Sequence, residues 1–174
     1  MKTKAAVMYA QNQPLVIEEL DLEGPKAGEV LIKYTASGIC HSDYSVVHGV
    51  LFGKKVPMVL GHEGAGIIEE VGPGVTHLKA GDHVIAVLTP SCGVCFMCKE
   101  AKPYMCTQMG KIMATGAMLD GTTRFSKNGK PYYHMCAVGT FSERSVIPAG
   151  AAIKIGDNAP LETVCLVGCG VTTG

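Results

Sequence analysis

Short runs of apolar and β-branched residues, separated by turns rich in glycine and proline, dominate this chain. They predict strands over residues 4–9, 15–22, 29–39, 64–71, 82–88, 141–147 and 151–155. Helical patterns are few. One or two turns over 42–48 would be capped by Ser42 or Asp43, and a core helix is expected over 161–167. With 22 glycines and nine prolines in 174 residues, the pattern predicts a mainly β, barrel-like chain with short helices.

Composition narrows the class of protein. Hydrophobic residues make up 47% of the chain and charged residues 17%, which indicates a globular fold. Fifteen basic residues balance fifteen acidic ones without a basic patch, which argues against nucleic acid and membranes as partners. Residues 1–20 contain no long apolar run, so neither a signal peptide nor a membrane span is expected. We therefore expect a cytoplasmic protein, in which clustered cysteines bind metal or do chemistry more often than they form disulfides.

Four of the eight cysteines lie within the fifteen residues "CGVCFMCKEAKPYMC": Cys92, Cys95, Cys98 and Cys106. Four thiolates close a tetrahedral shell around zinc, and a closed shell stabilises a loop but binds no substrate. The spacing therefore predicts a structural zinc loop over 92–106. An iron–sulfur cluster is the main alternative, because three cysteines two residues apart also suit such a cluster. Disulfides stay open if the compartment is oxidising.

The remaining cysteines and histidines have plain interpretations when taken singly. Cys136 and Cys165 read as buried free thiols. The histidines at 48, 77, 83 and 134 read as surface or hydrogen-bonded side chains. Cys40, His62 and Cys169 stand in three separate glycine-containing segments, "GICHSD", "GHEGAG" and "CLVGCG".

Four further stretches accompany these three segments along the chain: "GDHV", the four-cysteine run, "DGTTRFSKNGKPYYH" and "GTFSERSVI". Together they resemble the zinc-dependent medium-chain alcohol dehydrogenases over nearly the whole chain. The resemblance implies that residues 1–174 form the N-terminal catalytic domain, a GroES-like β-barrel. In that family a Rossmann domain follows the point where this sequence ends. Neither "GAGIIEE" nor "GCGVTTG" has the glycine spacing and following βαβ unit of a dinucleotide site, so we expect that domain to be absent from this chain.

The resemblance assigns Cys40, His62 and Cys169 as ligands of a catalytic zinc with an open fourth position, the set established for alcohol dehydrogenases. With the loop, this implies two zinc ions per chain. The implied reaction is hydride transfer from a primary or secondary alcohol to NAD or NADP, giving an aldehyde or ketone. The full-length enzyme is expected to be a homo-oligomer, and the isolated chain is expected to be inactive.

The same resemblance gives roles to neighbouring residues. Ser42 would contact the substrate oxygen and start a proton relay, Asp43 would orient the histidine ligand, and Glu63 would lie behind the zinc. His41 would contact the coenzyme pyrophosphate, as a weaker and pH-dependent substitute for the arginine of many members. The residues that align with the substrate pocket are apolar: Leu88, Met135 and Cys136.

A second position, besides His41, departs from the family pattern. Ser45 stands where many members carry a relay histidine, so the route by which the proton leaves is not implied by the resemblance. Two interpretations from other classes stay open: a zinc-binding module without turnover, and a redox-responsive zinc thiolate protein. The zinc-free quinone reductases of the same superfamily are disfavoured, because both ligand sets are intact.

Overall fold

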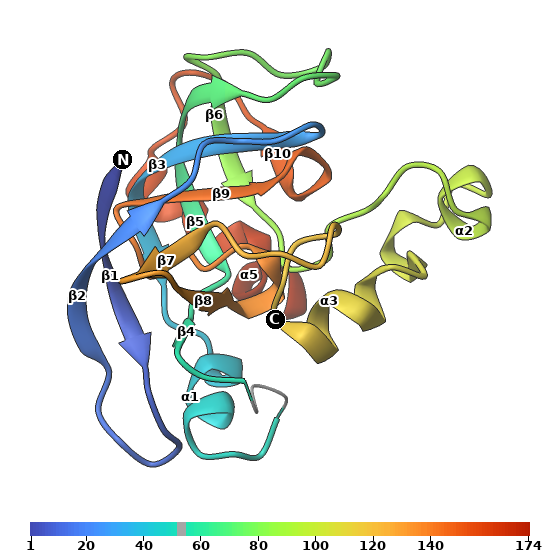
Figure 1. The fold of residues 1–174 in the computed structure, drawn as a ribbon. Coiled ribbons are helices and arrows are strands. Elements are labelled where there is room, and N and C mark those ends of the chain that lie inside the picture. The colour runs from blue at the N-terminus through green and yellow to red at the C-terminus, as the bar shows by residue number, and fades with distance from the viewer. Residues whose placement is uncertain (52–54) are drawn as a thin grey trace.

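The structure, a computed structural model, describes residues 1–51 and 55–174 and consists of two β-sheets with short helices at their margins (Figure 1). The first sheet closes into a barrel in the order β1-β2-β7-β8-β4. Its strands are β1 (Lys2–Met8), β2 (Val16–Leu22), β4 (Met58–Val59), β7 (Phe125–Lys127) and β8 (Lys130–His134). Among the described strands, only β4 and β8 pair in parallel.

The second sheet has five strands in the order β10-β6-β5-β3-β9. Its strands are β3 (Glu29–Gly38), β5 (Glu63–Val71), β6 (His83–Ala86), β9 (Arg144–Pro148) and β10 (Ala152–Lys154). Strand β3 lies between β5 and β9: it pairs with β5 from Val30 to Gly38, with two register shifts, and with β9 along its first half. The buried apolar residues of the described ranges form three clusters, and the largest includes Ile32, Leu60, Ile68, Val84 and Ile147. The predicted mainly β, barrel-like fold is confirmed.

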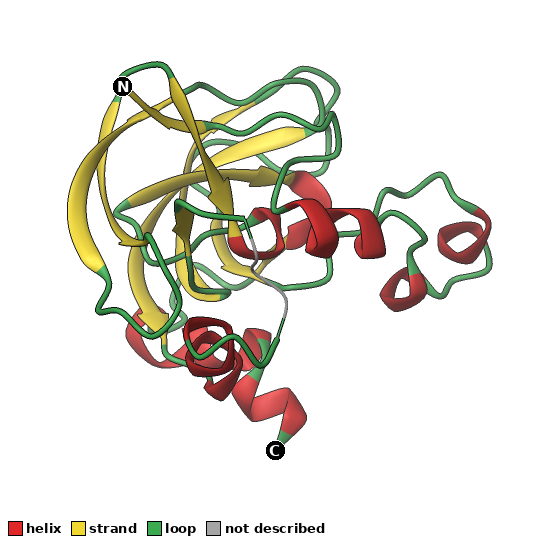
Figure 2. Ribbon diagram, turned by 60° about the horizontal axis from the view of Figure 1, so that its bottom comes forward, coloured by secondary structure: helices red, strands yellow, loops and turns green. Residues whose placement is uncertain are grey.

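Short helices connect the strands and gather mostly on one side of the sheets (Figure 2). They are α1 (His41–Val47), α2 (Phe96–Lys99), α3 (Met109–Thr115), α4 (Leu161–Val164) and α5 (Gly170–Thr173), with 3₁₀ turns η1 (Pro103–Met105), η2 (Met135–Ala137), η3 (Ala149–Ala151) and η4 (Cys165–Gly168). No helix among the described residues is long and apolar enough to cross a membrane.

One helix prediction is correct in place but not in kind, and one hairpin was not predicted. The core helix expected over 161–167 is a single α-helical turn, α4, followed by the tighter turn η4. Gly168, the last residue of η4, lies against β6, where a side chain would clash with the Ala86 carbonyl oxygen. The hairpin β7–β8 was not predicted. Its signal was the dipeptide Asn128–Gly129, whose φ angles of 51° and 75° suit a two-residue hairpin turn.

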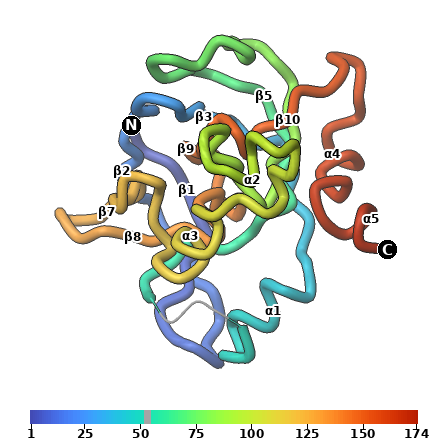
Figure 3. The backbone as a smooth tube through the Cα atoms, turned by 90° about the vertical axis from the view of Figure 1, so that its right-hand side faces the viewer, coloured from blue at the N-terminus to red at the C-terminus, as the bar shows by residue number. Residues whose placement is uncertain are grey.

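Residues 92–106 form a lobe that projects away from the two sheets, with α3 leading the chain back (Figure 1); in Figure 3 this lobe points toward the viewer. Within this lobe only Cys106 is buried, whereas Val94, Phe96 and Tyr104 are each more than two-thirds exposed. The lobe therefore has no apolar core of its own, and its fold must depend on the cysteines.

A buried ion pair ties the segment that returns from the lobe to the second sheet. The guanidinium of Arg124 donates from Nε to Glu29 Oε2 at 2.8 Å and from Nη2 to Glu29 Oε1 at 2.6 Å. It also donates to Asp120 at 2.8 Å. The Arg124 side chain is fully buried, so this bidentate contact lies where water does not screen it.

Candidate metal centres

Cys40, His62 and Cys169 converge on one point, together with Glu63. Each of these side chains offers one ligand atom, and the four atoms lie within 4.8 Å of one another. Cys40 lies between β3 and α1, His62 directly precedes β5, and Cys169 lies between η4 and α5. The second sheet and the C-terminal turns thus bring together three segments that are far apart in the sequence.

Helix α1 begins at Cys40, which is its N-cap residue. The Cys40 Sγ atom accepts a hydrogen bond from the Ser42 N–H at 3.5 Å, and Asp43 Oδ2 accepts one from the Cys40 N–H at 3.0 Å. The prediction that Ser42 or Asp43 caps the helix is therefore wrong. Because β3 runs almost directly into α1, the first helical turn already contains both residues, and Asp43 reaches back to the cap.

Asp43 links the two sides of this site. Its Oδ1 atom accepts a hydrogen bond from the Gly61 N–H at 3.0 Å and lies 3.4 Å from His62 Nδ1, an electrostatic contact slightly longer than an ordinary hydrogen bond. Burial lowers the pKa of His62, but the carboxylate of Asp43 and the thiol group of Cys40 more than offset this and raise it. Gly61 has a φ of 88° and lies against Phe141, so a side chain at this position would displace the N–H that holds Asp43.

Glu63 is a buried member of this cluster, and its carboxylate holds the turn that carries Cys169. Its Oε1 atom accepts a hydrogen bond from the Gly170 N–H at 2.8 Å. An added Cβ at Gly38 would lie 2.3 Å from Glu63 Oε2, so glycine at this position makes room for the carboxylate. The carboxylate of Glu63 thus lies beside the other three side chains, and its role behind a zinc ion stays a prediction.

The thiols of Cys40 and Cys169 in this cluster have pKa values that are shifted in opposite directions. Burial raises the pKa of Cys40, but the hydrogen bonds from Ser42 and the nearby His62 lower it overall. Burial raises the pKa of Cys169, and the neighbouring Cys40 adds to that rise while Thr173 opposes it. A cation between them would favour the thiolate form of both residues.

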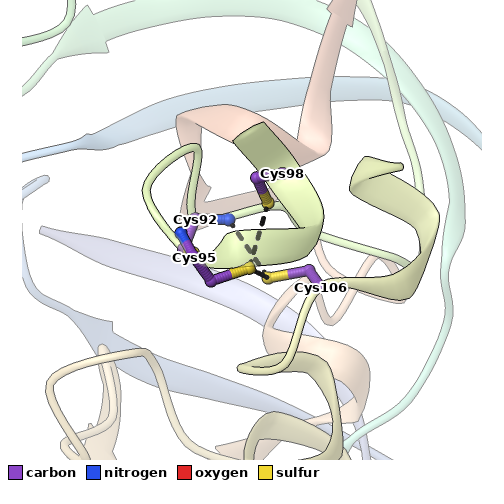
Figure 4. Close-up of side chains that lie close together, drawn as sticks. All are labelled: Cys92, Cys95, Cys98 and Cys106. Carbon is purple, nitrogen blue, oxygen red and sulfur yellow. Dashed lines mark hydrogen bonds between the residues drawn. The ribbon is translucent and has the colours of Figure 1, made fainter. Parts of the chain in front are cut away.

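The second cluster is the four-cysteine lobe (Figure 4). The four Sγ atoms lie within 4.8 Å of one another, with Cys95 3.5 Å from Cys98 and 4.0 Å from Cys106. Backbone N–H groups already point at two of the sulfurs: that of Cys92 donates to Cys106 Sγ and that of Cys95 to Cys92 Sγ, both at 3.4 Å. Tetrahedral zinc with bonds of about 2.3 Å would place its four sulfurs roughly 3.8 Å apart, which these positions fit.

The thiols of Cys95 and Cys98 in the lobe have pKa values that are shifted in opposite directions. Hydrogen bonds from the backbone N–H groups of Thr107 and Cys98 lower the pKa of Cys95 to about 5. Burial and the neighbouring Cys95 raise the pKa of Cys98 to about 11. Thr107 was not singled out from the sequence, and its position directly after the last cysteine of the motif was the only signal for it.

Comparison with known proteins identifies the family. Residues 26–157 match the family described as "Alcohol dehydrogenase GroES-like domain". The chain belongs to this family. The whole chain aligns at 52% identity with an NDMA-dependent alcohol dehydrogenase of Amycolatopsis methanolica, covering 46% of it. It aligns at 49% identity with an S-(hydroxymethyl)glutathione dehydrogenase of Escherichia coli, covering 47%.

The solved structures agree with the fold of this alcohol dehydrogenase GroES-like domain. An alcohol dehydrogenase zinc-binding domain protein from Burkholderia ambifaria superposes with a TM-score of 0.93 at 36% identity, over 99% of this chain and 47% of that one. The resemblance inferred from the motifs is confirmed. The chain spans about half the length of the curated relatives it matches.

Two of the other predicted residues of this GroES-like domain, Ser42 and Cys136, lie near the first cluster. Ser42 is half-buried in the first turn of α1, and its hydroxyl group helps to lower the pKa of the Cys40 thiol. Leu88, Met135 and Cys136 belong to one apolar cluster. Burial, with a smaller contribution from Asp43 and Cys169, raises the pKa of the Cys136 thiol to about 12, so this side chain is a neutral, apolar surface beside the site.

Proposed function

We propose that this chain is the catalytic half of a zinc-dependent alcohol dehydrogenase that oxidises a primary or secondary alcohol with NAD or NADP. The observation that supports this most strongly is the convergence of Cys40, His62 and Cys169 within 4.8 Å. Two sulfurs and one imidazole are a donor set that leaves zinc an open position for substrate. Zinc bound there supplies Lewis acidity that favours loss of the alcohol proton, and the nicotinamide accepts the hydride.

The surrounding side chains would prepare the site for this reaction. Ser42, half-buried beside Cys40, receives the alcohol proton. Asp43 holds His62 and the Cys40 backbone in position. Apolar side chains exclude water from the reacting carbon and favour a hydrophobic alcohol: Leu88, Met135 and Cys136.

The lobe would hold a second zinc ion, giving two ions per chain. The spacing of its sulfurs supports zinc over a polynuclear iron–sulfur cluster, because the irons of such a cluster would separate the thiolates further. All four sulfurs face one point, which leaves no open position for a substrate. The role of this ion is structural, since the lobe has almost no buried apolar side chains.

The coenzyme would be bound by a part of the protein outside these 174 residues. Both sheets of the described ranges are antiparallel apart from β4 and β8, so no βαβ unit is present in them. The isolated chain would therefore not hold a nicotinamide at hydride distance, and positioning of this kind supplies roughly 7–11 kcal/mol of barrier reduction. Both relatives are named for substrates that carry a hydroxyl group, an alcohol and S-(hydroxymethyl)glutathione, which supports an alcohol as substrate.

One experiment tests the whole proposal. The 174-residue chain and the protein encoded by the complete reading frame are purified without added metal, analysed for zinc and iron, and assayed for alcohol-dependent reduction of NAD and NADP. We expect up to two zinc ions in each, with turnover only in the longer protein. Iron with visible charge-transfer absorption would contradict the zinc assignment. Turnover by the 174-residue chain alone would show that the coenzyme site lies within it.

The cell compartment and the assembly state are part of the same proposal. The family resemblance supports a homo-oligomeric, cytoplasmic enzyme, and sedimentation of the longer protein together with cell fractionation would test these two points.

A further inference from the structure

The turn η2, which follows β8, contains two consecutive residues in a conformation that L-amino acids rarely adopt. Cys136 has a φ of 54° and Ala137 a φ of 57°, both in the left-handed region. Neither residue is a glycine, so each Cβ atom is crowded against the following carbonyl group and the backbone is strained. A strained conformation of this kind persists only where the surrounding structure holds it in place.

The strained turn lies beside the first cluster. After the turn, the Thr140 N–H donates to the Gly61 carbonyl at 3.0 Å, and the Gly61 N–H donates to Asp43 Oδ1 at 3.0 Å. Burial is the main cause of the raised pKa of the Cys136 thiol, and the nearby Asp43 and Cys169 add to it. The sulfur of Cys136 is nevertheless not one of the four converging ligand atoms. Cys136 therefore faces the cluster as a neighbour and not as a ligand.

A side chain on β9 holds the residue that directly follows the strained pair. The hydroxyl group of Ser145 donates to the Val138 carbonyl oxygen at 2.5 Å, the nearer of two carbonyls that it can reach. Among the described residues no other group donates to this carbonyl. Ser145 and Val138 are both completely buried, so bulk water cannot replace the hydroxyl group. Ser145 thus fastens the turn to β9, whose backbone is fixed by its pairing with β3.

We propose that Ser145 is a positioning residue that sets the size of the alcohol, because its hold on Val138 keeps η2 left-handed and keeps Cys136 against the substrate space. The proposal rests on the proposed function, since it takes an alcohol as the ligand. Cys136 meets the substrate, and Ser145 acts only through it. Without the Ser145 hydroxyl group the turn relaxes, Cys136 withdraws and the space beside the first cluster widens. A small alcohol then loses contacts that a bulky alcohol keeps.

The position of the turn can be measured without turnover, because Cys136 is itself a reporter. In the zinc-loaded protein encoded by the complete reading frame, the buried Cys136 thiol should resist alkylation by iodoacetamide. In Ser145→Ala we expect alkylation of Cys136 to be about fivefold to tenfold faster, the loss of roughly one net hydrogen bond. Mass spectrometry of the Cys136 peptide measures the rate. Cys165, buried outside both clusters, reports general unfolding and should stay protected.

Three further variants separate this hydrogen bond from folding. Ser145→Thr keeps the hydroxyl group and should keep Cys136 protected. Ser142→Ala is the matched control, because the Ser142 hydroxyl group donates to the carbonyl of Gly139 in the same loop, and a glycine there needs no support. Ala137→Gly, added to Ser145→Ala, should restore protection, because glycine adopts a φ of 57° without strain. A double variant that stays unprotected would show that Ser145 does not act against this strain.

The same variants give the specificity readout. With ethanol, Ser145→Ala should raise KM about fivefold to tenfold and leave kcat nearly unchanged, because the lost contacts are made equally in the ground and transition states. With benzyl alcohol KM should change less, so the preference for benzyl alcohol over ethanol in kcat/KM should increase. Ser145→Thr should restore the wild-type preference. An enzyme that is merely destabilised would lose kcat for both alcohols alike.

A folded Ser145→Ala protein with a protected Cys136, or one with faster alkylation but an unchanged alcohol preference, would overturn the proposal. If Ser145→Ala does not fold, Ala137→Gly alone tests the strain. It should raise the melting temperature, and a lower melting temperature would overturn the proposal. Absence of turnover in the wild-type protein would contradict the proposed function instead, and the alkylation rates would still decide whether Ser145 holds η2.

Discussion

Asp43 Oδ1 lies 3.4 Å from His62 Nδ1, and both side chains are almost completely buried. The same carboxylate accepts hydrogen bonds from the Cys40 N–H and the Gly61 N–H. One side chain therefore fixes the start of α1, the turn before β5 and the imidazole between them. Two of the three proposed catalytic zinc ligands depend on it for their positions.

Replacing this carboxylate should weaken metal binding without unfolding the domain. Asp43→Asn keeps the shape of the side chain and one acceptor oxygen but removes the charge that faces His62. Loss of such a partner costs about 10–100-fold in metal affinity, so we expect that decrease at the Cys40/His62/Cys169 site. Competition with a chromophoric zinc chelator measures it. The four-cysteine site of the same protein is the internal control, and an unchanged affinity at the first site would contradict the positioning role.

Breaking the four-cysteine cluster should release the lobe and leave the sheets folded. Cys95→Ser removes a sulfur that lies 3.5 Å from Cys98 and 4.0 Å from Cys106. Because the lobe lacks apolar burial, we expect loss of one zinc ion per chain, a lower melting temperature and protease cleavage within 92–106. Cys165→Ala is the matched control, since Cys165 is buried outside both clusters. If Cys95→Ser keeps the wild-type zinc content and melting temperature, the lobe holds no structural zinc.

Removing the buried guanidinium of Arg124 should lower the free energy of unfolding of the domain. Arg124→Ala leaves Glu29 buried without its bidentate partner, and breaking a buried pair in this way costs about 3–5 kcal/mol of the free energy of unfolding. Arg144→Ala is the comparison, because Arg144 makes a similar contact with Glu69 at the surface, where about 0–1 kcal/mol is expected. Denaturant unfolding of both variants decides the point. Equal losses in the two variants would show that burial of Arg124 is unimportant.

The stability of the domain should fall in acid partly because of His134. This ring is fully buried, and its burial, with the nearby Arg124, lowers its pKa to about 3. The neutral form is favoured in the folded state, so the contribution of His134 is complete above the unfolded-state pKa of about 6.5 and is lost as the pH falls toward 3. Between these values the free energy of unfolding should lose roughly 1.4 kcal/mol per pH unit through this residue.

His134→Gln tests this linkage. The amide oxygen can still accept the hydrogen bond that the Arg124 N–H donates to His134 Nε2 at 3.0 Å, but the side chain does not titrate. Between pH 6 and pH 4 the free energy of unfolding of this variant should decline less steeply than that of the wild type. The difference in slope should correspond to the uptake of about one proton on unfolding. His77→Gln, at an exposed position, is the control. Parallel pH profiles for the wild type and His134→Gln would mean that His134 is protonated in the folded protein.

The sequence alone determined what local spacing and composition can encode. Strands separated by glycine and proline turns predicted a mainly β barrel, because the period of two and the turn residues act over a few positions. The four cysteines of 92–106 are close enough in the chain that their spacing alone restricts them to a few kinds of site. The remaining assignments came from a resemblance in several motifs, and the family comparison confirms that resemblance.

The tertiary structure decided which distant residues meet. No local pattern brings Cys40, His62 and Cys169 within 4.8 Å, since this depends on how β3 pairs with β5 and on the close approach of Gly168 to β6. The contact of Arg124 with Glu29, across 95 positions, has the same origin. Two contacts within α1 also could not be predicted from the sequence: the cap at Cys40 and the contact between Ser45 and His41. Side-chain direction and burial decide which of several neighbouring polar groups form a hydrogen bond with each other. Spacing specifies the candidates for a site, and packing selects among them.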